Sequence, residues 1–227
     1  MLPVSNPHGK PPGPAPSKMS HCVVTATGKD ELLRAAPGPV AAASRLVPEV
    51  TGQPSLDRLA ALAARLLGSP SAQISLLTDV QTIAGGSGLV PGTVGAQSPL
   101  SESLCTVTAR NRGALVVPDA RTDARVAGLP PVTSGEVGSY LGVPLLDAAG
   151  RTVGALCVFD PVPRAWSDTD VSLLEELAAA TVAELELSAL AVEYNTVRVR
   201  LGLALEAAGI GSFDLTWAPV TSRGTSG

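Results

Sequence analysis

The chain has 227 residues, enough for one ordinary domain with extensions, and 45% of them are hydrophobic while only 3% are aromatic. A core of this composition must be built from Leu, Val and Ala. The formal net charge is −4 at pH 7, and the sequence provides no concentrated basic face, which argues against a nucleic-acid partner.

Residues 1–52 are rich in Pro, Gly, Ser and Ala and show little hydrophobic periodicity. They are predicted to form a disordered tail, because such a composition buries too little apolar surface to offset the entropy of ordering. The tail lacks the apolar segment of a secretory signal. The three cysteines, at positions 22, 105 and 157, form neither a disulfide framework nor a CxxC pair, so a cytoplasmic location is expected.

A helix and then a hairpin are predicted after this tail. In LDRLAALAARLL apolar residues recur at helical spacing, with Ser55 as the N-cap and Gly68 as the terminator. The stretches AQISLLTD and VQTIAGGSG, residues 72–79 and 80–88, predict two strands of a hairpin. The glycines of the second stretch are predicted to open a loop to Pro99, and the missing Lys-Ser/Thr pair argues against a phosphate loop.

The next segment is predicted to contain a helix, a short strand, one or two helical turns and a loop. A second helix is expected over residues 100–111 with Ser101 as its N-cap, and ALVVPD predicts a short strand that Pro118 ends. DARTDARV predicts one or two helical turns, with Asp119 as a cap, and GLPPVTSGEV predicts a loop.

Two clear strands follow, SYLGVPLLD and RTVGALCVFD, joined by a turn at residues 148–150. Pro144 lies inside the first of them. Because proline cannot donate a ladder hydrogen bond, it indicates an edge position or a bulge.

A very long helix is predicted over residues 168–207, with Ser167 or Asp168 as its cap. Its length favours a two-helix contact or coiled coil, and the alternative is two helices with a break near Tyr194. Four glutamates between residues 171 and 192 exclude a membrane span. The apolar stripe, together with two leucines of the first helix, predicts a homodimer seam formed by Leu59, Leu62, Val171, Leu174, Ala178, Val182, Leu185, Ala189 and Val192.

In their order and spacing, several motifs resemble a GAF domain. ISLLTDVQTIAGGSGL resembles the first hairpin of that family, and SLCTVTARNRGALVVPDARTDARV resembles the helix, strand and turn that follow it. YLGVPLLDAAGRTVGALCVFDPVPRAWSDTDVSLLEELA resembles the closing hairpin and C-terminal helix. The resemblance implies an α+β fold over residues 53–190, in which a central antiparallel sheet is flanked by helices and a long signalling helix follows.

A shorter resemblance lies at the end of the chain. LGLALEAAGIGSFDLTWAP is similar to the opening of a PAS domain, which would leave residues 208–227 as the truncated start of that domain. GAF followed by PAS is similar to the sensory half of bacterial signalling proteins. The Ala-, Gly- and Val-rich composition favours an actinobacterial PPM-type serine/threonine phosphatase as the full-length protein, by analogy alone.

No catalytic constellation is found in the sequence. A nucleophilic Cys needs a base, and the two histidines, His8 and His21, both lie in the predicted tail. Thr106 takes the place of the His that usually follows the attachment Cys in bilin-binding GAF domains. We therefore expect no metal and no cofactor. Cys105 is interpreted as a small buried residue of a pocket wall, with a redox role shared with Cys157 as the alternative.

The expected function is a non-catalytic sensory domain that dimerises and relays a signal along the long helix to a PAS domain and an output enzyme. A ligand-free structural dimerisation module and a thiol redox sensor or enzyme are the alternatives. The identity of any small-molecule ligand stays open. The residues expected to line a ligand pocket are Ile83, Leu104, Cys105, Val117, Asp119, Tyr140, Val143 and Cys157.

Overall fold

A computed structural model describes residues 38–46, 53–111 and 113–207 of the chain. Within these ranges one six-stranded sheet forms with the order β3-β2-β1-β6-β5-β4, and all neighbouring strands are antiparallel. This confirms the predicted α+β class with flanking helices and a long C-terminal helix. The strands are β1 (Ser71–Leu77), β2 (Val80–Ser87), β3 (Gln97–Pro99), β4 (Leu115–Val117), β5 (Ser139–Leu146) and β6 (Thr152–Asp160).

Two hairpins meet at the centre of the sheet, and they are the two strand pairs that the sequence predicts. β1 and β2 form one, β5 and β6 form the other, and β1 pairs with β6, so that Gln73 lies opposite Cys157. The short strand β4 pairs with β5 only over residues 140–142, which leaves β5 with one neighbour at Pro144. The predicted edge position of this proline is confirmed.

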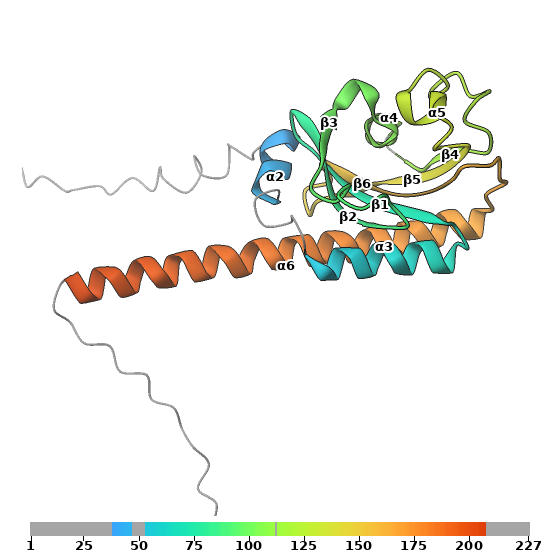
Figure 1. Cartoon of the computed structure of the whole chain (residues 1–227). Helices are drawn as coiled ribbons and strands as arrows, with labels where there is room; N and C mark the ends of the chain where they lie inside the picture. Colours follow the sequence, from blue (N-terminus) through green and yellow to red (C-terminus); the bar gives the residue numbers. More distant parts are fainter. Residues whose placement is uncertain (1–37, 47–52, 112, 208–227) are drawn as a thin grey trace, which may run out of the picture. The chain divides into compact units, whose positions relative to one another are not determined.

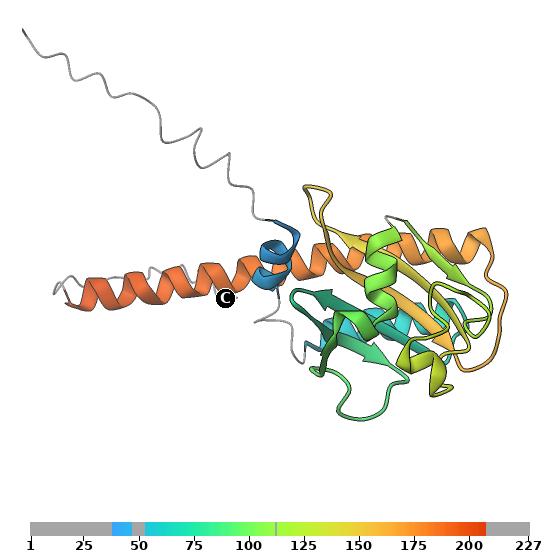
Figure 2. The same cartoon turned by 90° about the horizontal axis from the view of Figure 1, so that it is seen from above.

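The two faces of the sheet carry different layers (Figure 1). The helices α3 (Pro54–Leu66) and α6 (Asp168–Ala207) cover one face, and their apolar residues share a core with those of β1, β5 and β6. The helix α4 (Leu104–Asn111), the single turn α5 (Pro130–Thr133) and the adjoining loops cover the other face. Figure 2 shows α4 lying across this second face. The sheet therefore separates two apolar clusters.

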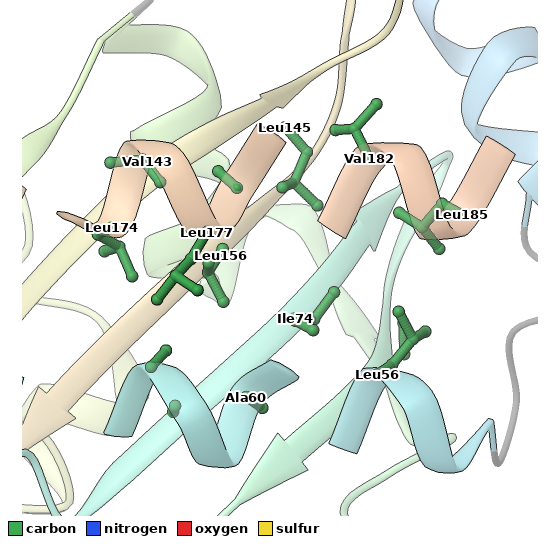
Figure 3. Close-up of a cluster of buried hydrophobic side chains, with 14 of the residues drawn as sticks. Leu56, Ala60, Ile74, Val143, Leu145, Leu156, Leu174, Leu177, Val182 and Leu185 are labelled. Atoms are coloured by element: carbon green, nitrogen blue, oxygen red, sulfur yellow. The ribbon is translucent and has the colours of Figure 1, made fainter. Parts of the chain in front are cut away.

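The first half of α6 packs on its own sheet, so the fully inward residues of the predicted dimer seam face this core and not a second copy. Figure 3 shows Leu174, Val182 and Leu185 pointing toward the apolar residues of β1, β5 and β6. These three residues and Ala178 are buried within the single chain. Leu59, Leu62, Val171 and Ala189 pack against the same core, and Val192 is half-buried. The sequence could not identify the partner of this apolar stripe, because the same spacing suits packing on a sheet and on a second helix.

The long helix is continuous over 40 residues, and the break considered near Tyr194 is absent from it. Ser167 is its N-cap. The Ser167 Oγ accepts a hydrogen bond from the Asp170 backbone N–H at 3.2 Å, and the Asp170 carboxylate accepts one from the Ser167 N–H at 2.8 Å. The second half of α6 runs on past the sheet (Figure 1), and most of its large apolar side chains from Leu187 onward are exposed, while Val192 and Leu205 are half-buried.

The segment of residues 39–46 was predicted to belong to the disordered tail, and this is wrong. Pro39–Leu46 forms the helix α2, and Ala42, Ala43 and Leu46 are buried in the core shared with α3 and α6. The sequence PVAAASRL is short, and its three inward residues are mostly small, so its periodicity is weak. Residues 1–37 and 47–52, which include Cys22, and the predicted PAS segment 208–227 lie outside the described residues.

Helix α3 begins two residues earlier than predicted. Its N-cap is Gln53, and Pro54, at the first helical position, has no backbone N–H to leave unpaired. The carboxylate of Asp57 accepts a hydrogen bond from the Gly86 N–H at 3.0 Å. A Cβ on Gly85 would lie 2.8 Å from that of Leu56. Gly85 and Gly86 therefore belong to β2 and permit its close contact with α3, instead of opening a loop.

The region before α4 also differs from the prediction of one helix over residues 100–111. Leu100–Glu102 forms a 3-10 turn, Ser103 is extended, and α4 begins at Leu104. The Ser103 Oγ accepts a hydrogen bond from the Thr106 N–H at 3.2 Å, so Ser103 caps this helix and Ser101 does not. The strand β3 and the turn α5 were missed, because three or four residues carry no periodic signal.

Candidate functional site

A cavity of about 360 Å³ lies between the sheet and the layer of α4, α5 and the preceding loops. This size falls at the small end of ligand pockets in proteins. Five of the eight predicted pocket residues line it: Ile83, Leu104, Cys105, Tyr140 and Cys157. Its polar lining includes Gln73, Gln81, Ser103, Glu102 and Glu136.

The other three predicted pocket residues do not line this cavity. Val143 points to the opposite face of the sheet and packs in the core beneath α6 (Figure 3). Val117 is buried in the apolar cluster of the cavity face without bordering the cavity. Asp119 accepts a hydrogen bond from the Arg121 N–H at 3.1 Å, so it caps a turn, as its alternative interpretation predicted. The structure therefore places these three residues outside this cavity.

Helix α4 and strand β6 bring the two buried thiols together. The alternation of β6 turns Ala155, Cys157 and Phe159 toward the cavity face. Cys105 lies in the first turn of α4, above this strand. The Sγ atoms of Cys105 and Cys157 are 3.8 Å apart, and both side chains are at most 3% exposed. Both cysteines are reduced.

Polar groups surround the sulfur of Cys105 on several sides. The Tyr140 hydroxyl donates a hydrogen bond to it at 3.8 Å, and the Gln73 Nε2 donates one at 3.9 Å. Gln73 also donates to the Ser75 Oγ at 2.7 Å, which fixes its amide group. The Tyr140 hydroxyl in turn lies 2.7 Å from that of Thr108. Two side-chain donors, the amide of Gln73 and the hydroxyl of Tyr140, therefore reach the sulfur of Cys105.

A glycine makes room for this tyrosine. Gly142 lies two residues after Tyr140 on the same face of β5, opposite Cys157 of β6. A Cβ on Gly142 would collide with the hydroxyl end of the Tyr140 ring. The absent side chain therefore lets the ring lie along the strand and reach Cys105 and Thr108.

This environment shifts the pKa values of Cys105, Cys157 and Tyr140 in different directions. The hydrogen bond from the Cys157 thiol lowers the pKa of Cys105 to about 7, against the opposing effect of burial, with further help from Ser75, Tyr140 and Ser103. The hydrogen bond to Cys105, together with burial, raises the pKa of Cys157 well above its usual range. Burial also raises the pKa of Tyr140. One thiolate therefore forms first, on Cys105, with a neutral thiol and a neutral phenol as its donors.

Sequence reasoning missed Gln73, Ser75, Ser103 and Thr108. The first two were available from the alternation of SAQISLL, since Ile74 and Leu76 face the helices and the polar residues between them must face the other way. Thr108 is one turn from Leu104, whose carbonyl oxygen accepts its hydroxyl hydrogen bond at 3.1 Å. Its approach to Tyr140 joins α4 to β5 and depends on tertiary packing.

A second cavity, of about 420 Å³, lies between α2, the β5–β6 turn and α6. Among its lining residues, Arg151 pairs with Asp147 at 2.6 Å, and Glu186 accepts a hydrogen bond from the Ala148 N–H at 3.4 Å. It contains neither thiol nor tyrosine. Within the described ranges no three His, Cys, Asp or Glu side chains gather as a metal site. No described helix has the length and apolar character needed to cross a membrane.

An antiparallel sheet with a cavity on one face and a long helix on the other is typical of the sensory domains of signalling proteins. Residues 52–185 match the family model of the GAF domain, and the chain belongs to this family. The predicted family is thereby confirmed.

The chain is similar to a cyclic di-GMP phosphodiesterase from Pseudomonas aeruginosa, with 36% identity over 92 residues. These residues are 39% of this chain and only 16% of that protein, so the two are related over a small part of the phosphodiesterase.

Three solved structures share the fold. The GAF domain of an Acinetobacter phosphoenolpyruvate-protein phosphotransferase matches 68% of this chain and 97% of its own, with a TM-score of 0.53 and 21% identity. A free methionine-R-sulfoxide reductase from Neisseria meningitidis, solved with its substrate, matches 67% and 91%, with a TM-score of 0.51 and 21% identity. A GAF sensor protein from Burkholderia vietnamiensis matches 65% and 92%, with a TM-score of 0.50 and 22% identity.

Proposed function

We propose that the chain is the non-catalytic sensory module of a signalling protein, which detects a small molecule in the cavity and relays its state through α6. The observation that carries this proposal is the arrangement of β5 and β6. Tyr140 and Cys157 border the cavity, whereas Val143 and Leu156, on the same two strands, pack beneath α6. A change in strand position caused on one face must therefore reach the helix on the other, because close-packed cores transmit displacement.

The end of α6 is the proposed output. We propose that it pairs with α6 of a second copy through an exposed stripe formed by Leu187, Leu190, Tyr194, Val197 and Leu201. These residues follow one another in steps of three and four, the spacing of a coiled-coil seam. In a parallel pair Glu193 would flank this seam opposite Arg198 of the second copy, with opposite charges. This seam replaces the predicted one, which packs on the sheet.

We further propose that the relay continues into a PAS domain that begins at residues 208–227 and then into an output enzyme. A PPM-type serine/threonine phosphatase is the first candidate, on the sequence resemblance alone. Turnover of cyclic di-GMP is the second, because the Pseudomonas relative is a cyclic di-GMP phosphodiesterase. A ligand-free dimerisation module is the competing function for this chain.

The test is whether the cavity is coupled to α6. Ile83→Trp places a large ring at the cavity wall, and Val162→Trp places the same ring on an exposed loop as a control. The sensory proposal expects altered amide hydrogen exchange over residues 186–207 in Ile83→Trp and none in Val162→Trp. Unchanged exchange in a folded Ile83→Trp would favour the dimerisation module.

A further inference from the structure

The two sulfur atoms are placed for chemistry that ligand binding does not require. A disulfide has an S–S length of about 2.05 Å, so the present separation of 3.8 Å must shorten by less than 2 Å. Cys105 lies in a helix turn and Cys157 in a strand, and both face the same cavity.

We propose that Cys105 and Cys157 are a hydroperoxide-reactive thiol pair, in which Cys105 is oxidised first and Cys157 then closes an intramolecular disulfide. Hydrogen peroxide is the reagent that the site fits, since the thiols are buried and only a small molecule can reach them through the cavity. The reaction is independent of the proposed relay, because it needs the two sulfurs and the cavity alone.

The first step consumes the peroxide. The Cys105 thiolate attacks one peroxide oxygen, an S–O bond forms, and the O–O bond breaks. Hydroxide leaves and becomes water with the proton that Cys105 released. Tyr140 and Gln73 donate hydrogen bonds to the sulfur of Cys105 and stabilise the thiolate that starts this step.

The second step forms the disulfide. Cys157 attacks the sulfenic sulfur of Cys105, the S–O bond breaks, and the departing hydroxide becomes water with the proton of Cys157. Two thiols and one hydrogen peroxide thus give one disulfide and two waters, and the two electrons that the sulfurs lose reduce the peroxide. Cys157 gains acidity at this stage, because the Cys105 thiolate that raised its pKa has disappeared.

The obvious competing interpretation is that both cysteines are inert core residues. An inert pair would be surrounded by apolar atoms, as free cysteines in cores usually are. Here the amide of Gln73 and the hydroxyl of Tyr140 both donate hydrogen bonds to the sulfur of Cys105. This arrangement favours a thiolate and so points to reactivity.

The experiment uses the full chain with Cys22→Ser, which removes the third cysteine. The protein is treated with one equivalent of hydrogen peroxide, alkylated, and mapped as peptides without reduction. The proposal expects both thiols to be lost together and a peptide pair that joins Cys105 to Cys157 within one chain. In Cys157→Ser the sulfenic acid of Cys105 should be trapped by dimedone. In Cys105→Ser the oxidation of Cys157 should be slower by about tenfold or more.

Two results would overturn the proposal. One is that both thiols of the folded Cys22→Ser protein remain open to alkylation after peroxide treatment. The other is that Cys157 forms the sulfenic acid when Cys105 is replaced, at the rate of the parent protein. Circular dichroism accompanies each serine variant, and the Cys22→Ser parent decides the question by itself if a variant fails to fold.

Discussion

Leu156 and Cys157 are neighbours in β6 and point to opposite faces of the sheet. Leu156 packs in the core beneath α6, with Leu174 and Leu177 in the same cluster (Figure 3). Cys157 borders the cavity, 3.8 Å from the sulfur of Cys105. One peptide bond therefore joins the part of the domain that borders the cavity to the part that packs beneath α6.

The first prediction concerns two leucines of α6 that are two residues apart. Leu185→Ala should lower the free energy of unfolding by about 2–5 kcal/mol, because it leaves a cavity in a core where Leu185 is fully buried. In a Val197→Glu background, which removes the proposed seam, Leu187→Ala at a position 64% exposed should change it by less than about 0.5 kcal/mol. Urea denaturation followed by circular dichroism measures both. Equal effects would contradict the packing of α6 on its own sheet.

The second prediction concerns helix α2. Leu46→Ala should destabilise the domain by about 2 kcal/mol or more, because Leu46 is buried with residues of α3, α6 and the sheet. Val40→Ala changes the same helix at an exposed position and serves as the control. A thermal melt of each variant decides the matter, and a Leu46→Ala melting temperature equal to that of Val40→Ala would show that α2 contributes nothing to the fold.

The third prediction separates two exposed valines on α6. Val197 lies in the proposed coiled-coil seam, whereas Val199 lies on the opposite side of the helix, and both are about 60% exposed. Val197→Glu should make the chain monomeric, because it buries like charges face to face, while Val199→Glu should leave the dimer intact. Analytical ultracentrifugation at micromolar concentration reads this out. If both variants, or neither, lost dimerisation, the seam would lie elsewhere.

Much of the fold followed from periodicity. Both hairpins and the continuous α6 were predicted because their apolar residues repeat over seven residues or more. The partner of the apolar stripe was not predictable in the same way. Leu174 and Leu185 have a spacing that suits packing on a sheet or on a second helix. Only the folded structure shows that their partner is the sheet of this chain.

The candidate site was predicted in part. Cys105, Tyr140 and Cys157 were selected from separate segments, and the redox alternative already paired the two cysteines, but the local sequence could not decide whether their sulfurs meet. Their contact depends on the register that sets Cys157 between Gln73 and Gly142, and on Ser103, which begins α4 at Leu104. Register across non-adjacent strands is decided by tertiary packing and is invisible in local pattern.

The fourth prediction is the pH dependence of peroxide oxidation. The pKa of Cys105 is lowered to about 7, so its thiolate is the minor form below pH 7 and the major form above it. The rate of thiol loss in the Cys22→Ser protein should therefore rise through pH 7 and level off above it, well below the value of 9.0 expected of an ordinary thiol. A rate that rises only near pH 9 would contradict the lowered pKa.

The Tyr140→Phe variant tests the cause of that shift. The groups that face Cys105 are Cys157, Tyr140, Gln73, Ser75 and Ser103, and Glu102 and Glu136 also line the cavity. Removing the phenol hydroxyl deletes one donor to the thiolate while both carboxylates and the other donors remain. The midpoint of the rate profile should therefore move to higher pH in Tyr140→Phe, because a thiolate with fewer donors is less stable than its thiol. Tyr194→Phe, on an exposed turn of α6, should leave the midpoint in place. A profile that shifts equally in both variants, or in neither, would show that the hydroxyl of Tyr140 does not set the acidity of Cys105.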